Sequence, residues 1–184
     1  MSEGTSRRKG LVIIYTGNGK GKTTAAIGLA VRAAGNRMRV FFLQFIKGRW
    51  KSGEREALRS LAPYVELAVT GRGFTLPHLR DPRIPLVDHQ DAATSGWELA
   101  KRLVRDGGYD MVVLDEVLGA VSAGLVPLGE VLDLARSKPP ELHLVLTGRG
   151  APPELVDAAD LVSEVLPIKH PHQRGIKAQR GIEF

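Results

Sequence analysis

The sequence contains no cysteine among its 184 residues. This absence excludes disulfides, thiolate nucleophiles and cysteine-ligated zinc or iron–sulfur clusters, so any metal ion must be bound by oxygen or imidazole ligands. No apolar run approaches the roughly 20 residues of a membrane-spanning helix, and the basic N-terminal segment is not followed by a signal-peptide pattern. We therefore expect a soluble protein without a membrane partner that stays in the cytoplasm.

Aromatic residues are also scarce, at 5% of the chain, and no patch interleaves them with Arg and Lys as base-stacking surfaces require. The net charge is nevertheless +6, with basic residues gathered at positions 7–9 and in the tail at Lys169, Arg174, Lys177 and Arg180. Such an excess fits solvated termini, a nucleic-acid partner or a bound triphosphate. Because aromatics are few, we expect no nucleic acid among the partners.

Short apolar runs alternate with helical patterns along the chain. The runs are typical of strands buried on both faces of a parallel sheet; they cover residues 11–15, 40–45, 65–69, 111–114, 142–146 and 161–166. Composition and apolar spacing predict helices over residues 22–34, 88–105 and 128–137. The alternation predicts an α/β fold with a mainly parallel sheet flanked by helices. We expect a flexible basic arm over residues 1–10 and a single domain with a C-terminal tail over residues 11–184.

Two loops differ from ordinary short connections. Residues 47–54 (KGRWKSGE) are basic and follow a strand end, whereas residues 71–85 (GRGFTLPHLRDPRIP) carry two glycines and three prolines. Ligands of open α/β sheets bind beyond the carboxyl ends of the strands, where both loops would emerge. The loops are candidates for a second substrate's site, and the alternative is that they only cover hydrophobic surface.

The segment 16–24 (TGNGKGKTT) lies between a predicted strand and a predicted helix, as a phosphate-binding loop must. Glycines let backbone N–H groups point inward, and the helix N-terminus adds partial positive charge. Lys22 would contact phosphate oxygens, and the Thr23 hydroxyl would bind Mg²⁺, which prefers oxygen ligands. Thr16 stands where the usual pattern has its first glycine, with Gly17 one residue late. The Gly-Lys-Thr core still predicts a P-loop NTPase-like (RecA-like) domain that binds ATP.

Two adjacent acids follow another apolar run. Asp115 and Glu116 come directly after residues 111–114, where a strand would reach the carboxyl edge of the sheet. One acid can complete the Mg²⁺ shell, and the alternative is an acidic helix start that accepts hydrogen bonds from backbone N–H groups. Arg149, after the run 142–146, is either a phosphate contact or a surface arginine.

Taken together, motifs over nearly the whole chain resemble those of the P-loop corrinoid adenosyltransferases. They are GNGKGKTTAA at residues 17–26, QFIKG at 44–48, GFT at 73–75, LDE at 114–116, LTGRG at 146–150, ADLVSEV at 159–165, and KHP, GI and QRGIEF in the tail. A phosphate loop alone would not distinguish a kinase from an ATPase, whereas GNGKGKTT combined with the closing GIEF does.

The resemblance implies that a Co(I) corrinoid attacks C5′ of ATP and expels triphosphate, as in adenosylcobalamin formation. It implies catalytic roles for Lys22, Thr23 and Glu116 and metal binding by Thr23, Glu116 and Asp115. ATP would lie along the loop in the reverse sense to other P-loop proteins. The expected ATP and corrinoid contacts are Gly17, Asn18, Gly19, Lys20, Gly21, Lys22, Thr23, Thr24, Arg149 and Phe74.

This chain departs from the family pattern in three places. Leu76 stands where the family often has a tryptophan, which together with the aromatic matched by Phe74 displaces the corrinoid's lower axial base. Only about ten residues precede the first predicted strand, so the N-terminal helix that caps a partner's corrinoid site in longer members would be short or absent. Residues 117–119 (VLG) are less polar than the family pattern.

The family also implies ATP and a reduced corrinoid as substrates, an electron-donating reductant protein and a homodimer. Three alternatives remain open. A P-loop ATPase or kinase acting on another small molecule would need a catalytic base, for which only Asp115 is a candidate. A nucleic-acid-binding ATPase and a regulatory binder without turnover are the others. Release of triphosphate, rather than phosphate or diphosphate, from ATP and reduced cobalamin separates the adenosyltransferase from all three.

Phe74→Ala is expected to lower turnover strongly with cobalamin and much less with cobinamide, which lacks the dimethylbenzimidazole base. Loss of the ring would let the base or water return to the lower face and make the cobalt harder to reduce, while ATP affinity stays the same. Turnover with both corrinoids and the thermal midpoint check this. Equal losses with both, on a protein destabilised by the about 3–5 kcal/mol typical of a buried Phe, would assign Phe74 to packing.

Overall fold

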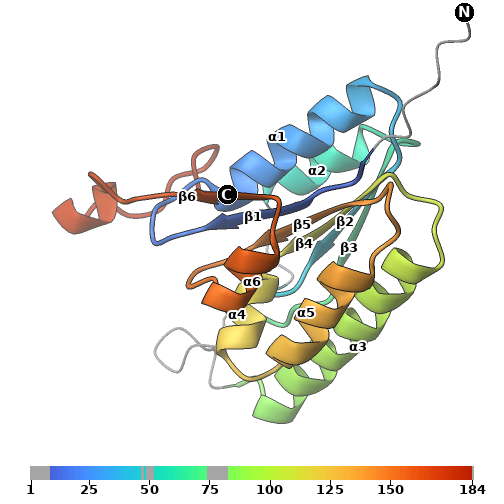
Figure 1. The fold of residues 1–184 in the computed structure, drawn as a ribbon. Helices are drawn as coiled ribbons and strands as arrows, with labels where there is room; N and C mark the ends of the chain where they lie inside the picture. The colour runs from blue at the N-terminus through green and yellow to red at the C-terminus, as the bar shows by residue number, and fades with distance from the viewer. Residues whose placement is uncertain (1–8, 47, 49–51, 74–82, 184) are drawn as a thin grey trace, which may run out of the picture.

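The computed structural model describes residues 9–46, 48, 52–73 and 83–183 (Figure 1). In this part of the chain, six parallel strands form one sheet in the order β3-β2-β4-β5-β1-β6. The strands are β1 (Val12–Thr16), β2 (Val40–Gln44), β3 (Val65–Val69), β4 (Met111–Asp115), β5 (His143–Thr147) and β6 (Leu161–Glu164). The helices are α1 (Lys22–Gly35), α2 (Gly53–Arg59), α3 (Leu86–Arg105), α4 (Val117–Ser122), α5 (Leu128–Ser137), α6 (Pro153–Ala158) and the 3₁₀ helix η1 (Pro171–Arg174).

Helices cover both faces of the sheet. α1 and α2 lie on one face, and α3, α4, α5 and α6 lie on the other (Figure 1). Successive strand residues enter opposite cores: Phe42 and Val113 pack on the α1 side, whereas Leu43 and Leu114 pack on the α3 side. All four are fully buried. Because both faces are covered, the central strands are apolar throughout instead of alternating with polar residues.

The predicted α/β fold with a parallel sheet is confirmed, and each predicted strand is present. The expectation that every strand is buried on both faces is wrong for the sheet edges. All four residues of β6 are exposed, and β3 is only partly buried, because an edge strand has a neighbour on one side alone. The sequence analysis also missed α2, α4, α6 and η1, which have 7, 6, 6 and 4 residues and are too short for a helical period.

The N-terminal segment that the structure describes is tied to the domain. The ammonium of Lys9 lies 3.1 Å from Asp160 Oδ1, and the Gly10 N–H donates to the Pro140 carbonyl. Residues 1–8 lie outside the described part, so the flexible arm stays a prediction. None of the described helices has the length and apolar character that crossing a membrane requires.

The topology brings distant polar residues to one edge of the sheet. β1 and β4 both flank β5, and the last residue of β4, Asp115, is in register with Gln44 at the end of β2. Since all strands run the same way, the loop after β1 and the polar ends of β2, β4 and β5 meet at the carboxyl edge. This is the edge at which open α/β sheets bind ligands.

Candidate nucleotide-binding site

The loop between β1 and α1 has a backbone that requires glycine. Gly17 and Gly21 have φ values of 100° and 127°, a region that glycine adopts without the steric cost of a side chain. Gly19 is needed for a different reason: its N–H donates to the Val165 carbonyl oxygen at 2.7 Å, and a Cβ there would lie 2.7 Å from that same oxygen. The segment that follows β6 therefore packs directly against the loop.

The side chain of Lys22 folds back onto this loop. Its Nζ donates to the carbonyl oxygens of Gly17 and Gly19, each at 2.8 Å, and the residue is 7% exposed. Burial lowers the pKa of Lys22, an effect that the nearby carboxylate of Glu116 opposes and the charge of Arg149 reinforces. An anion at this position would offset the cost of burying the ammonium group, as a phosphate does.

Asp115 is the centre of a buried network of hydrogen bonds. Its Oδ1 accepts from the Thr23 hydroxyl at 2.9 Å and from the Thr147 hydroxyl at 2.8 Å. Its Oδ2 accepts from Gln44 Nε2 at 3.2 Å, and no part of the residue is exposed. The carboxylate thus fixes the first turn of α1 to the ends of β2 and β5.

The network continues to α2 through residues that the sequence analysis did not single out. Gln44 Oε1 accepts from Arg55 Nε at 3.0 Å, and the Arg55 guanidinium also donates to the Gly48 carbonyl at 2.8 Å. Arg55 therefore orients the amide of Gln44 with its NH₂ group toward Asp115. The sequence feature that could have identified Gln44 is a polar residue at the end of an apolar strand, within the QFIKG motif.

Glu116 has a strained backbone and lies on the cavity side of Asp115. It adopts a left-handed conformation with φ 62° and ψ 21°, which a residue other than glycine occupies at a cost of roughly 1–3 kcal/mol. Its N–H donates to the Thr147 hydroxyl at 2.9 Å. Unlike Asp115, Glu116 lines the cavity described below. One of the two adjacent acids is thus buried, and the other faces the cavity.

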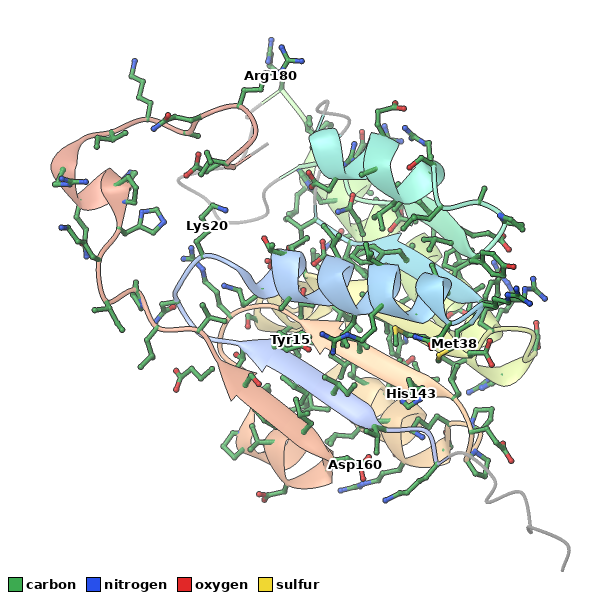
Figure 2. All side chains as sticks on the ribbon, turned by 90° about the horizontal axis from the view of Figure 1, so that it is seen from above. Tyr15, Lys20, Met38, His143, Asp160 and Arg180 are labelled. Atoms are coloured by element: carbon green, nitrogen blue, oxygen red, sulfur yellow. The ribbon has the colours of Figure 1, made fainter. Side chains whose placement is uncertain are left out.

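A cavity of about 770 Å³ lies over the phosphate loop, within the size range of cofactor sites. Residues 18–24 line it together with Glu116 and Arg149, so these expected nucleotide contacts surround one space. Figure 2 shows Lys20 pointing from the loop toward the C-terminal tail. Two of the expected contact residues that the structure describes do not line the cavity. The Gly17 carbonyl accepts a hydrogen bond from Lys22, and the Asp115 carboxylate accepts one from the Thr23 hydroxyl.

The cavity also contains residues that the sequence analysis missed. Ile27 of α1 and Glu54 at the start of α2 form part of its wall, and the tail supplies His170 and residues 181–183. The KHP and GIEF motifs of the tail had been noted only as marks of family resemblance. Their distance from the phosphate loop in the sequence gave no indication of contact.

The two long loops meet beyond the ends of β2 and β3, where a Cβ on Gly48 would lie 3.2 Å from the Gly73 nitrogen. The Gly73 N–H donates to the Ile46 carbonyl at 3.0 Å, and a Cβ on Gly71 would lie 2.3 Å from the Phe45 carbonyl oxygen. Most of the second loop, including Phe74 and Leu76, lies outside the described residues. The role of these loops as a second substrate's site stays a prediction.

The donor atoms fit Mg²⁺ bound jointly by protein and phosphate. Thr23 and Glu116 offer oxygen ligands on the cavity side, and oxygen is what this cation prefers. Within the described ranges, no three His, Asp or Glu side chains gather into a metal site.

The parallel sheet, the glycine loop between β1 and α1 and the buried aspartate closing β4 define a RecA-like P-loop fold. A family model described as ATP:corrinoid adenosyltransferase BtuR/CobO/CobP matches residues 8–184. The chain belongs to this family of transferases, which confirms the resemblance inferred from the motifs.

Named relatives agree with this assignment. The chain is 39% identical over 180 residues to the corrinoid adenosyltransferase of Escherichia coli (strain K12), covering 96% of this chain and 86% of that protein. It is 41% identical to corrinoid adenosyltransferase CobA of Salmonella typhimurium, with the same coverage. To the corrinoid adenosyltransferase of Pseudomonas aeruginosa it is 39% identical over 176 residues, with 96% and 84% covered.

Asp115→Asn is expected to destabilise the fold by about 1–3 kcal/mol, the usual cost of an unsatisfied buried polar group. If the new NH₂ faces Gln44, two donors oppose each other; if it faces Thr147, the buried hydroxyl of Thr147 loses its acceptor. Glu116→Gln, on the cavity side, should cost less. Chemical denaturation of both variants without nucleotide checks this, and equal stability losses would contradict the division between the two acids.

Proposed function

We propose that this chain transfers the 5′-deoxyadenosyl group of ATP to the Co(I) centre of a corrinoid and releases triphosphate. The observation that carries the proposal is the cavity over residues 18–24 in a chain whose family is ATP:corrinoid adenosyltransferase. ATP would occupy this cavity, and the corrinoid would approach from the loops after β2 and β3.

The reaction asks little acid–base chemistry of the protein. The electron pair of Co(I) forms the Co–C5′ bond, the C5′–O5′ bond breaks, and its pair stays on the triphosphate. No proton has to leave the nucleophile, so no general base is required. The remaining tasks are to hold C5′ in line with the cobalt and to stabilise negative charge on the leaving group.

The groups around the cavity suit a leaving-group clamp. Lys20, Lys22 and Arg149 supply three positive charges, and the loop backbone and the N-terminus of α1 supply partial positive charge. Lys22 is already held by two loop carbonyls, so little reorganisation accompanies the reaction. Preorganised groups of this kind stabilise charge as it develops.

Mg²⁺ is the cofactor that the donor set supports. Thr23 and Glu116 would hold it together with phosphate oxygens, and Asp115 would hold the Thr23 hydroxyl in place. When bound, the ion neutralises charge on the triphosphate. In the protein itself, the Asp115 hydrogen bond directs the Thr23 oxygen, and the left-handed backbone of Glu116 directs its carboxylate.

The partners are inferred from the family and from the surface. We propose that a separate reductant protein supplies the electrons for Co(I) and that the reaction takes place in the cytoplasm. A homodimer is supported by exposed apolar side chains on β6, an edge strand of the described sheet, where Leu161 is 42% and Val162 37% exposed. The rival, an ATPase or kinase acting on another small molecule, predicts phosphate or diphosphate as product.

Lys22→Ala and Thr23→Ala are expected to lower triphosphate release by about 10² to 10³, as loss of a preorganised contact to developing charge does. The fold should survive, because neither side chain belongs to the apolar cores and Asp115 keeps its hydrogen bonds from Thr147 and Gln44 when Thr23 is replaced. Thr23→Ser retains the hydroxyl and should keep most activity. Lys101→Ala, on α3 away from the cavity, is the control. Triphosphate formed from ATP and reduced cobalamin is the measurement, and near-normal release by Lys22→Ala would refute the clamp.

Glu116→Gln is expected to raise the Mg²⁺ concentration needed for half-maximal activity more than Asp115→Asn does. The reason is that Glu116 faces the cavity, whereas both oxygens of Asp115 already accept hydrogen bonds from the protein. Activity titrated against Mg²⁺, under conditions where each variant is folded, gives the comparison. A larger shift for Asp115→Asn would reverse the assignment of the two acids.

A further inference from the structure

The C-terminal tail forms an outer wall of the cavity over the phosphate loop. It starts beside the loop, where Val165 accepts a hydrogen bond from Gly19, and its last described residues, 181–183, line the cavity together with Glu54 of α2. Figure 2 shows the tail leaving β6 and arching back toward α2, with Lys20 pointing into the space between. The tail thus encloses the side of the site that the sheet leaves open.

Within this wall, the imidazole of His170 is held in one orientation. Its Nδ1 accepts from the His172 backbone N–H at 3.2 Å, and the His170 N–H donates to Gln173 Oε1 at 3.1 Å. These reciprocal bonds cap the short helix η1. A ring nitrogen that accepts a hydrogen bond carries no proton, so the neutral ring has its proton on Nε2. Nε2–H is therefore the donor that His170 can offer to a ligand.

His170 lines the same cavity as residues 18–24, and its side chain is partly buried. We propose that His170 Nε2–H donates a hydrogen bond to an oxygen of the triphosphate bound on the phosphate loop, which makes it a further ligand-contacting residue of this reaction. The inference rests on the proposed nucleotide site and adds a residue to it.

A triphosphate suits this donor better than the nucleoside does. The tail contacts the phosphate loop where Val165 accepts a hydrogen bond from Gly19, five residues before His170. Gly19 and His170 line the same cavity. Phosphate oxygens are acceptors only, which matches a nitrogen that can only donate. A hydrogen bond from this donor would stabilise negative charge on the leaving group.

The test compares His170→Asn, His170→Ala and His172→Ala in the full-length protein. An asparagine can still accept from the His172 N–H and cap η1, but it is too short to replace Nε2–H. His172 is an exposed histidine of the same helix, and its substitution leaves the backbone donor intact, so it is the matched control. Calorimetric affinities for inorganic triphosphate and for adenosine, each with Mg²⁺, are measured beside thermal midpoints.

We expect His170→Asn and His170→Ala to weaken triphosphate binding by about tenfold to a hundredfold, the usual range for a hydrogen bond to a charged group, with adenosine affinity unchanged. His172→Ala should bind as the unmodified protein does. Unchanged triphosphate affinity in His170→Asn, or a loss confined to adenosine, would overturn the proposal. The binding assay contains no corrinoid, so it tests the His170 contact separately from adenosyl transfer. A negative result would overturn the His170 contact and leave adenosyl transfer standing. A positive result would support the contact even if the protein transferred a different group.

Discussion

A carboxylate with no exposure to water is the constraint around which the site is built. Asp115 would be costly to bury alone, and its two oxygens are satisfied by Thr23 on α1, Thr147 on β5 and Gln44 on β2. Each of these donors comes from a different element, so the hydrogen bonds hold the phosphate loop in register with the sheet. Arg55 extends the same chain of contacts to α2.

The different positions of the two adjacent acids follow from this constraint. β4 ends with Asp115 pointing into the protein, and the chain must then turn sharply if the next carboxylate is to face the ligand. The left-handed backbone of Glu116 makes that turn. Strain at a residue that lines a cavity is typical of functional sites, because the surrounding network has to maintain it.

Side chains of both charges line the cavity. Lys20, Lys22 and Arg149 face the cavity together with Glu54, Glu116 and Glu183, so the phosphate loop is not surrounded by a purely basic surface. The basic tail residues noted in the sequence, Lys169, Arg174, Lys177 and Arg180, are exposed and do not line the cavity. His170, in the same segment, lines the cavity.

The sequence by itself determined the parallel α/β sheet, the phosphate loop, the pair of acids and the family. These features are encoded locally, in apolar runs, glycine spacing and short motifs. The exposure of β6, the different positions of Asp115 and Glu116, and the contacts of Gln44, Arg55 and His170 were decided only by the tertiary structure. They depend on which strands lie at the sheet edge, on the register that sets Gln44 beside Asp115, and on where the tail returns to the loop. Such contacts join residues far apart in the chain, and no local pattern specifies them.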